Sequence, residues 1–197
     1  MNLSLIDADK VVPRAWRNGG GTTRELLTWP GSGDWQLRIS RADIGADGPF
    51  SAFDGVQRWF AVLQGHGVAL RFADREHVLR VGDAPLCFDG AQAPGCRLVD
   101  GPTTDLNLMA RGGSGWMAPV LANTPWRSSM PMRGLYSTVA GLWRGDATQM
   151  NIPANTLLWT ADALPGPWTF TPAATPSSSS GVALWLAFAP LPENTTS

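Results

Sequence analysis

Side chains that can bind a small anion are concentrated in one segment, Trp16-Arg17-Asn18-Gly19-Gly20-Gly21-Thr22-Thr23-Arg24-Glu25-Leu26. Successive glycines allow a ligand to approach the backbone closely and permit positive φ angles, which leaves the N–H groups of Gly20 and Gly21 free to bind an anion or a carbonyl oxygen. The ligand-competent side chains around them are Asn18, Thr23, Arg24 and Glu25. The segment lacks the Gly-Lys-Ser/Thr of a nucleotide-binding phosphate loop. It is either a ligand-binding loop or a flexible connection before the first strand.

Two expected strands each carry polar side chains on one face. Arg38 and Ser40 alternate with apolar residues on one of these strands, and Asp105 and Asn107 do so on the other. If both polar faces line the interior of a barrel, the four side chains converge on one cavity, where each buried charge must find a partner. Two alternatives remain open: the polar faces meet solvent, or Arg38 pairs with Asp105 as a purely structural bridge.

A turn-like segment between these strands begins with Gly48-Pro49 and delivers Arg58 to the start of the next strand. Its aromatic residues, Phe50 and Phe53, can form a lid over a pocket or plug the end of a barrel. An arginine at this place can bind a carboxylate through two parallel hydrogen bonds.

Metal ligands are scarce in this sequence. A protein metal site needs several imidazole, thiolate or carboxylate ligands that converge on one cation. His66 and His77 are the only histidines of the sequence, which is fewer than the imidazoles that a histidine-based metal site uses. We expect both histidines to lie in turns or at the surface. The two cysteines, Cys87 and Cys96, are expected to be unpaired core residues in a reducing compartment. The sequence therefore predicts no metal and no other cofactor, and it assigns no catalytic residue.

The elements that must position these residues are all β-strands. Short apolar or alternating runs bounded by Gly, Pro, Asp and Ser recur along the chain, and helical periodicity is hard to find. The predicted strands are Thr22–Thr28, Trp35–Ala42, Gln57–Gln64, Val68–Phe72, Val78–Arg80, Ala84–Phe88, Arg97–Val99, Asp105–Arg111, Gly134–Gly141, Thr148–Ile152, Thr156–Thr160, Trp168–Thr171 and Val182–Ala189.

The length is compatible with one domain or with two. A chain of 197 residues, 44% of them hydrophobic, fits either one large β domain or two barrels of about 90 residues each, and composition alone does not choose between them. The Gly-rich patch that begins at Gly112 marks the expected junction. We expect a first barrel with the ligand pocket at residues 1–112 and a second, degenerate barrel at residues 113–197.

The charge balance bears on the expected partners, and the first residues bear on the expected location of the protein. The 15 basic and 16 acidic residues give a net charge of −1 without long runs of one sign, which argues against nucleic acid and anionic membrane as partners. The first twelve residues carry Asp7 and Asp9 and lack the apolar stretch of a signal peptide or a spanning helix. We expect a cytoplasmic protein.

The sequence resembles known proteins in two ways, through a phrase typical of cupins and through an ordered set of motifs. Val62-Leu63-Gln64-Gly65-His66-Gly67 with Val81-Gly82-Asp83, and Gly141-Leu142-Trp143-Arg144-Gly145-Asp146 further on, resemble the cupin phrase of a strand, a Gly hairpin and a Gly-Asp turn. The ordered set of motifs resembles the HutD/Ves family: Trp16…Asn18-Gly19-Gly20-Gly21…Thr23-Arg24-Glu25, Leu37-Arg38-Ile39-Ser40…Ala42, Gly48-Pro49-Phe50-Ser51…Phe53…Gly55…Arg58, and Asp105-Leu106-Asn107-Leu108-Met109. The resemblance covers about residues 16–111, and the second half matches only in length and β character.

The resemblance implies both a fold and a biological setting. The fold is all-β, a double-stranded β-helix of the cupin (RmlC-like jelly roll) type, with two tandem barrels that make a bicupin. The setting is histidine utilisation in bacteria, in which family members are thought to act as accessory or regulatory proteins. The pocket implied by the family maps onto Asn18, Thr23, Arg24, Glu25, Arg38, Ser40, Arg58, Asp105 and Asn107, and the expected ligand is a carboxylated intermediate such as urocanate, formiminoglutamate or formylglutamate.

Three functions remain open at this point. The first is a metal-independent binding protein that senses such a metabolite. The second is a metal-free isomerase or formimino or formyl hydrolase that uses Glu25 or Asp105 as a general base. The third is a scaffold that binds a partner or a second copy of itself, as a homodimer, through an apolar surface patch. That patch would comprise Trp126, Trp143, Trp159, Trp168 and Trp185 of the second barrel.

Overall fold

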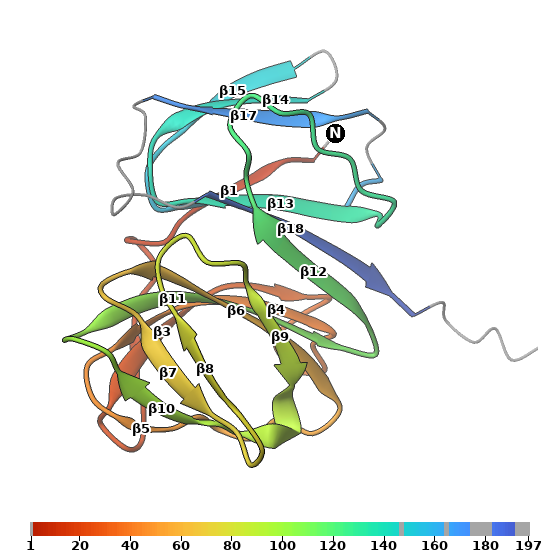
Figure 1. The fold of residues 1–197 in the computed structure, drawn as a ribbon. Coiled ribbons are helices and arrows are strands. Elements are labelled where there is room, and N and C mark those ends of the chain that lie inside the picture. Colours follow the sequence, from red (N-terminus) through yellow and green to blue (C-terminus); the bar gives the residue numbers. More distant parts are fainter. Residues whose placement is uncertain (1, 146–147, 164–165, 174–182, 192–197) are drawn as a thin grey trace, which may run out of the picture.

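The protein consists of two stacked β-barrels (Figure 1). The computed structural model describes residues 2–145, 148–163, 166–173 and 183–191. Within these ranges the one helical element is a 3-10 turn at Gly90–Gln92. The described part of the chain contains no helix long and apolar enough to cross a membrane. The expectation of an all-β fold with two tandem barrels is confirmed.

The first barrel is made of two sheets whose strands come from residues 14–111. The six-stranded sheet has the order β2 (Arg14–Ala15), β3 (Gly21–Trp29), β4 (Leu37–Ile44), β11 (Thr103–Arg111), β6 (Val56–Gln64) and β9 (Leu86–Asp89). The four-stranded sheet has the order β5 (Gly48–Pro49), β10 (Gly95–Leu98), β7 (Val68–Arg71) and β8 (Glu76–Leu79). All pairings in both sheets are antiparallel.

The second barrel also has a larger and a smaller sheet. The five-stranded sheet has the order β1 (Ser4–Asp7), β16 (Thr156–Thr160), β13 (Met132–Ser137), β18 (Ala183–Pro190) and β12 (Gly113–Pro119). The three-stranded sheet has the order β15 (Thr148–Ile152), β14 (Gly141–Gly145) and β17 (Trp168–Pro172). Val182, which was predicted to begin the last strand, lies outside the described residues.

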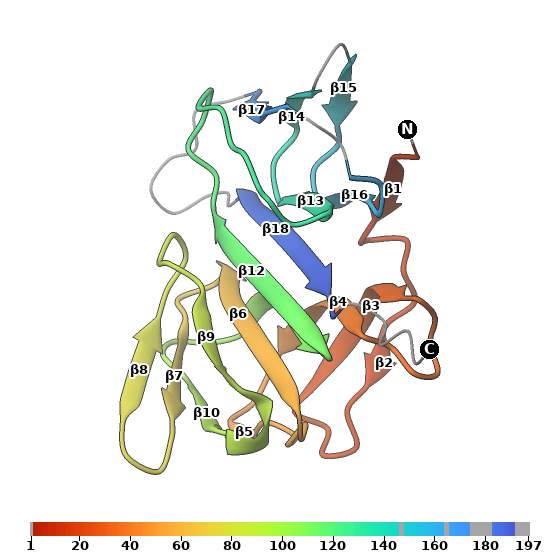
Figure 2. The same cartoon turned by 90° about the vertical axis from the view of Figure 1, so that its right-hand side faces the viewer.

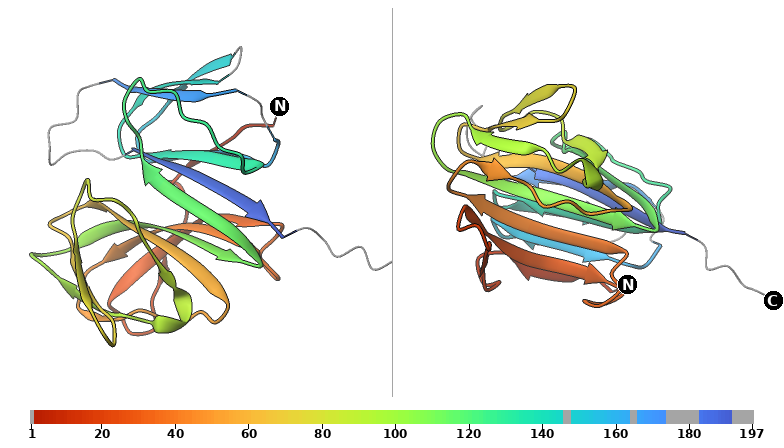
Figure 3. Two further views of the ribbon diagram at one scale, coloured as in Figure 1. Left: turned by 45° about the vertical axis from the view of Figure 1, so that its right-hand side comes forward. Right: turned by 90° about the horizontal axis from the view of Figure 1, so that it is seen from below.

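The two larger sheets face each other across a shared apolar core. Leu37 and Ile39 of β4 and Leu106 and Leu108 of β11 are fully buried there. They belong to one cluster with residues of the second barrel, among them Met117, Leu157, Leu186 and Phe188. Figures 2 and 3 show β12 and β18 crossing this junction beside the first barrel. Because the apolar faces of β4 and β11 are used between the barrels, their polar faces turn into the first barrel.

The chain crosses between the barrels at two places. Gly112 (φ 63°) forms the turn that joins β11 to β12, at the position of the predicted boundary. The predicted Gly-rich junction is therefore not a linker, because β12 starts at Gly113 and pairs along its length with β18. The second crossing lies near the N-terminus. Strand β1 pairs with β16 of the second barrel although it falls within residues 1–112.

Tryptophans fill the interior of the second barrel. Trp143 and Trp168 are fully buried and Trp185 nearly so, and Trp126 stacks on Trp185 with ring centroids 4.8 Å apart. Trp159 is buried in the core between the barrels. The sequence favoured core filling for most of the tryptophans, and this is confirmed; the alternative of an apolar surface patch is wrong, since the barrel uses their large area to fill its own centre.

One predicted strand, residues 134–141, is two strands in the structure. Strand β13 ends at Ser137, whose hydroxyl donates to the carbonyl oxygen of Val139 and accepts from its N–H, at 2.7 and 3.2 Å. These hydrogen bonds bend the chain, and β14 begins at Gly141. A serine side chain that bonds to its own backbone competes with the sheet ladder in this way.

Candidate functional site

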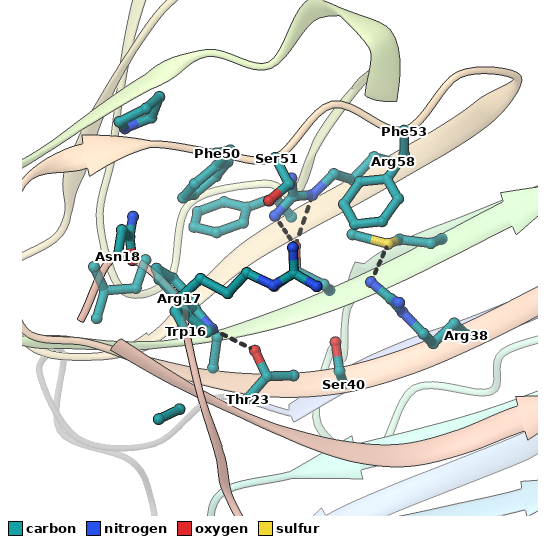
Figure 4. Close-up of a pocket in the computed structure, with 17 residues that line it drawn as sticks. Trp16, Arg17, Asn18, Thr23, Arg38, Ser40, Phe50, Ser51, Phe53 and Arg58 are labelled. Carbon is teal, nitrogen blue, oxygen red and sulfur yellow. Dashed lines mark hydrogen bonds between the residues drawn. The ribbon is translucent and has the colours of Figure 1, made fainter. Parts of the chain in front are cut away.

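A cavity of about 480 Å³ opens into the first barrel (Figure 4). Four neighbouring strands, β3, β4, β11 and β6, line it with the residues of one face, because successive side chains of a strand point to opposite faces. From these strands come Thr23, Arg38, Ser40, Ala42, Ile44, Arg58, Phe60, Asn107 and Met109. The short strands β2 and β5 and the loops beside them add Ala15, Trp16, Arg17, Asn18, Pro49, Phe50, Ser51 and Phe53. Eight predicted site residues therefore share one cavity: Asn18, Thr23, Arg38, Ser40, Phe50, Phe53, Arg58 and Asn107.

Arg58 is held rigidly in the wall of the cavity. Its Nε and Nη2 atoms donate to Oδ1 of Asn107 at 2.9 and 2.7 Å, and its guanidinium lies 4.4 Å from the ring centre of Phe50. Burial, followed by the charge of Arg38, lowers the pKa of Arg58 to about 9. The group is still protonated at neutral pH, and a bound anion would offset the cost of burying its charge.

Arg38 carries a second positive charge without a carboxylate partner. Its guanidinium lies 5.1 Å from the ring centre of Trp35 and 5.0 Å from that of Phe53, and Nη2 contacts the sulfur of Met109 at 3.1 Å. Burial lowers its pKa, although the negative charge of Glu25 opposes the shift. Among the described residues no carboxylate lies within salt-bridge distance of Arg38, so the predicted structural bridge to Asp105 is not formed.

Arg17 is the third arginine of the cavity and was not among the predicted site residues. It belongs to the glycine-rich segment, where sequence reasoning selected its neighbour Asn18. Strand alternation gives a direction to side chains such as Arg38, but a loop residue has no such periodicity. Figure 4 shows the Arg17 side chain extended into the cavity toward Arg58.

Asp105 lies inside the first barrel but does not line the cavity. Its side chain is fully buried, and neither carboxyl oxygen accepts a hydrogen bond of normal geometry from a described residue. Burial raises the pKa of this carboxyl well above 3.8 and outweighs the opposing effects of the Arg58 charge and the nearby Thr103 hydroxyl. Burial favours the protonated form of Asp105 and the charge of Arg58 favours the ionised form, and among the described residues Asp105 forms no ion pair with an arginine of the cavity.

The remaining predicted residues lie outside the lining. Arg24 forms an ion pair with Asp43, on the face of the sheet opposite to Arg38. Glu25 is paired in register with Ser40 and acts on Arg38 only through its charge. Gly20 and Gly21 border a separate hollow together with Asp43. The structure thus does not bring these residues, or Asp105, to the wall of the cavity.

The lining lacks the donors that a metal ion needs. It contains no imidazole, carboxylate or thiol, and the parts of the chain that the structure describes hold no cluster of three or more such side chains. His66 is exposed at a turn, and His77 lies on β8, where it packs edge-on against Phe72. The residues present do not fit a metal centre in this cavity.

The comparisons with known proteins agree with this architecture. A family model described as HutD matches residues 8–158. The chain belongs to the HutD family. This HutD-family protein is also 29% identical to the protein Ves of Escherichia fergusonii over 145 residues, which cover 72% of this chain and 75% of that protein.

Solved structures share the fold of this HutD-family protein over almost its whole length. A conserved protein of unknown function from Pseudomonas aeruginosa PAO1 has a TM-score of 0.82 and 24% identity, with 97% of this chain and all of that chain covered. HutD from Pseudomonas fluorescens SBW25 has a TM-score of 0.79 and 24% identity, with 95% and 98% covered. The expected fold class, a double-stranded β-helix of the cupin type with two tandem barrels, is confirmed.

Proposed function

We propose that this protein binds a small carboxylated metabolite in the cavity of its first barrel and serves as an accessory or regulatory protein of histidine catabolism in the cytoplasm. One observation carries the proposal: Arg17, Arg38 and Arg58 border a cavity whose lining contains no acidic residue. A cavity with excess positive charge in a protein interior favours an anionic ligand, because such a ligand offsets the cost of burying the cations.

The polar and aromatic residues of the cavity also suit a small organic acid. A guanidinium binds a carboxylate through two parallel hydrogen bonds, and hydroxyl and amide groups such as Ser40, Ser51 and Asn18 can orient its other polar atoms. Phe50 and Phe53 supply apolar walls, and the volume of about 480 Å³ lies within the usual range of small-molecule sites. Urocanate, formiminoglutamate and formylglutamate all have this combination of a carboxylate and a short polar or aromatic body.

Binding is favoured over catalysis by the position of the acidic residues. An isomerase or hydrolase of these compounds needs a general base within hydrogen-bond reach of the substrate. Glu25 and Asp105, the two predicted candidates, are both absent from the lining. The geometry therefore supports a sensor or carrier of a metabolite more than an enzyme.

Isothermal titration calorimetry tests the proposal with the three metabolites and the purified full-length protein. We expect at least one of them to bind with a dissociation constant below a millimolar and to bind more weakly as salt is added, because charge pairs near a surface are screened. Parallel incubation followed by chromatography checks for product. The absence of heat with all three ligands, at millimolar concentrations and low salt, would contradict the proposal.

A further inference from the structure

The three arginines of the cavity are held in different ways. Arg58 is 6% exposed and is fixed by Asn107, and Arg38 lies between the rings of Trp35 and Phe53. Arg17 is exposed, and no carboxylate of the described residues lies within salt-bridge distance of its guanidinium. Two positive charges therefore lie in the wall of the cavity, whereas the third is carried by an exposed side chain.

The backbone beneath Arg17 is well anchored. The indole N–H of Trp16 donates to the hydroxyl of Thr23 at 2.7 Å, and its backbone N–H donates to the carbonyl oxygen of Gly21 at 2.9 Å. The N–H of Gly19 in turn donates to the carbonyl oxygen of Trp16 at 3.0 Å. These bonds fix the backbone on either side of Arg17, so its exposed side chain starts from a defined point at the edge of the cavity.

The charges of the cavity exceed what one carboxylate can compensate. A single carboxylate has two oxygens and can occupy one guanidinium in a bidentate manner. With one such ligand bound, two of the three arginine charges stay uncompensated by the ligand. A ligand with a second anionic group reduces this excess to one charge and gives Arg17 a partner.

We propose that Arg17 recognises a second anionic group, so that the cavity selects small dicarboxylates over monocarboxylates of the same size. This inference rests on the proposed function, namely that the cavity binds carboxylated molecules. Among the metabolites considered above, formylglutamate and formiminoglutamate carry two carboxylates and urocanate carries one. Arg17 is then the residue that determines specificity, and Arg38 and Arg58 supply the general affinity for anions.

A pair of isosteric probes tests this inference by calorimetry. Glutarate has two carboxylates, and its monoamide has the same length and shape with one carboxylate replaced by an amide. We expect the wild-type protein to bind glutarate about tenfold more tightly than the monoamide, as a charge-assisted hydrogen bond to a partly exposed arginine predicts. The Arg17→Gln variant should lose this preference and keep its affinity for the monoamide within about twofold.

Arg14→Gln is the matched control, because Arg14 is an exposed arginine of β2 that does not line the cavity. If Arg14→Gln lowers the preference for glutarate as much as Arg17→Gln does, the preference comes from the overall positive charge near the cavity and not from a contact with Arg17. The inference is then wrong. If both probes bind equally to the wild-type protein, the inference fails while the proposed function stands. If neither probe nor any of the three metabolites binds, both fail.

Discussion

Arg58 lies diagonally across two neighbouring strands from Asn107, and both of its hydrogen bonds go to the one amide oxygen of that residue. In the register of β6 and β11, Arg58 is opposite Met109, so the bond to Asn107 reaches two residues further along β11. Two N–H groups of the guanidinium thus have a hydrogen-bond acceptor, and this acceptor carries no charge. The positive charge of Arg58 therefore stays available for a ligand.

Replacing this neutral acceptor by a charged one should close the site to anions. In Asn107→Asp the new carboxylate would pair with Arg58 and repel an incoming carboxylate. We expect the affinity for the carboxylated ligand to fall at least about tenfold, with the folded state retained, because the hydrogen-bond geometry is preserved. Calorimetry measures the affinity, and Asn151→Asp on the exposed strand β15 is the control for added charge. Unchanged binding by Asn107→Asp would contradict the role given to Arg58.

Removing the charge of Arg38 should weaken ligand binding without lowering the stability of the fold. Arg38→Met keeps a long side chain between Trp35 and Phe53 and removes a half-buried charge that has no carboxylate partner. We expect the affinity for carboxylates to fall about tenfold and the free energy of unfolding to stay equal or rise by about 1 kcal/mol. Urea unfolding monitored by tryptophan fluorescence measures the second quantity, with the exposed Arg71→Met as a control. A clear loss of stability would show that Arg38 is a structural residue.

The buried carboxyl of Asp105 should make stability depend on pH. Its pKa in the folded state is raised above 3.8, so between 3.8 and the folded pKa the folded state holds a proton that the unfolded state has lost. The free energy of unfolding therefore decreases as the pH rises through this window. Asp105→Asn removes the titration, and we expect the variant to gain stability relative to the wild type as the pH rises from about 4 to 8. Urea unfolding at a series of pH values measures both free energies. If they change with pH in the same way in the two proteins, the pKa of Asp105 is not raised in the folded state.

Close packing between the neighbouring strands β13 and β16 should make Gly134 intolerant of a side chain. A Cβ at this position would lie 2.5 Å from Cε3 of Trp159 and 2.9 Å from the backbone oxygen of Leu158. We expect Gly134→Ala to lower the free energy of unfolding by about 1–3 kcal/mol, the usual cost of overpacking. Gly31→Ala, where nothing lies within 4 Å, is the matched control and should change little. Thermal unfolding compares the two, and equal melting temperatures would contradict this account.

Several residues that line the cavity could be predicted from the alternation of polar and apolar residues along two strands. The alternation of Arg38 with Leu37 and Ile39, and of Asn107 with Leu106 and Leu108, predicted that polar and apolar residues point to opposite faces of their strands. The structure adds that the apolar faces are covered by the second barrel, which explains why the polar faces turn inward. A single strand sequence does not contain this information, because it does not say which face meets solvent.

Some predicted placements differ from the structure, for different physical reasons. Arg24 was predicted to share a site with Thr23, but neighbouring residues of a strand point to opposite faces, so Arg24 lies on the face of Asp43 and away from the cavity. Asp105 belongs to the polar face of β11, yet it lies too deep to line the cavity. For Trp143 and Trp168 the sequence favoured core filling and left a surface patch as an alternative, and the closure of the second barrel decides for the core.

The sequence by itself determined the β-strands and the alternating faces of β4 and β11, because these depend on local alternation and on turn residues that act within a few positions. The two-barrel fold was implied by the resemblance to the HutD/Ves family. The tertiary structure decided which charges share a cavity. It brought Arg17, Arg38 and Arg58 together and kept every acidic side chain out of the lining. That outcome depends on how loops and strands far apart in the chain pack in three dimensions, since electrostatic interactions act through distance in space and not through separation in sequence.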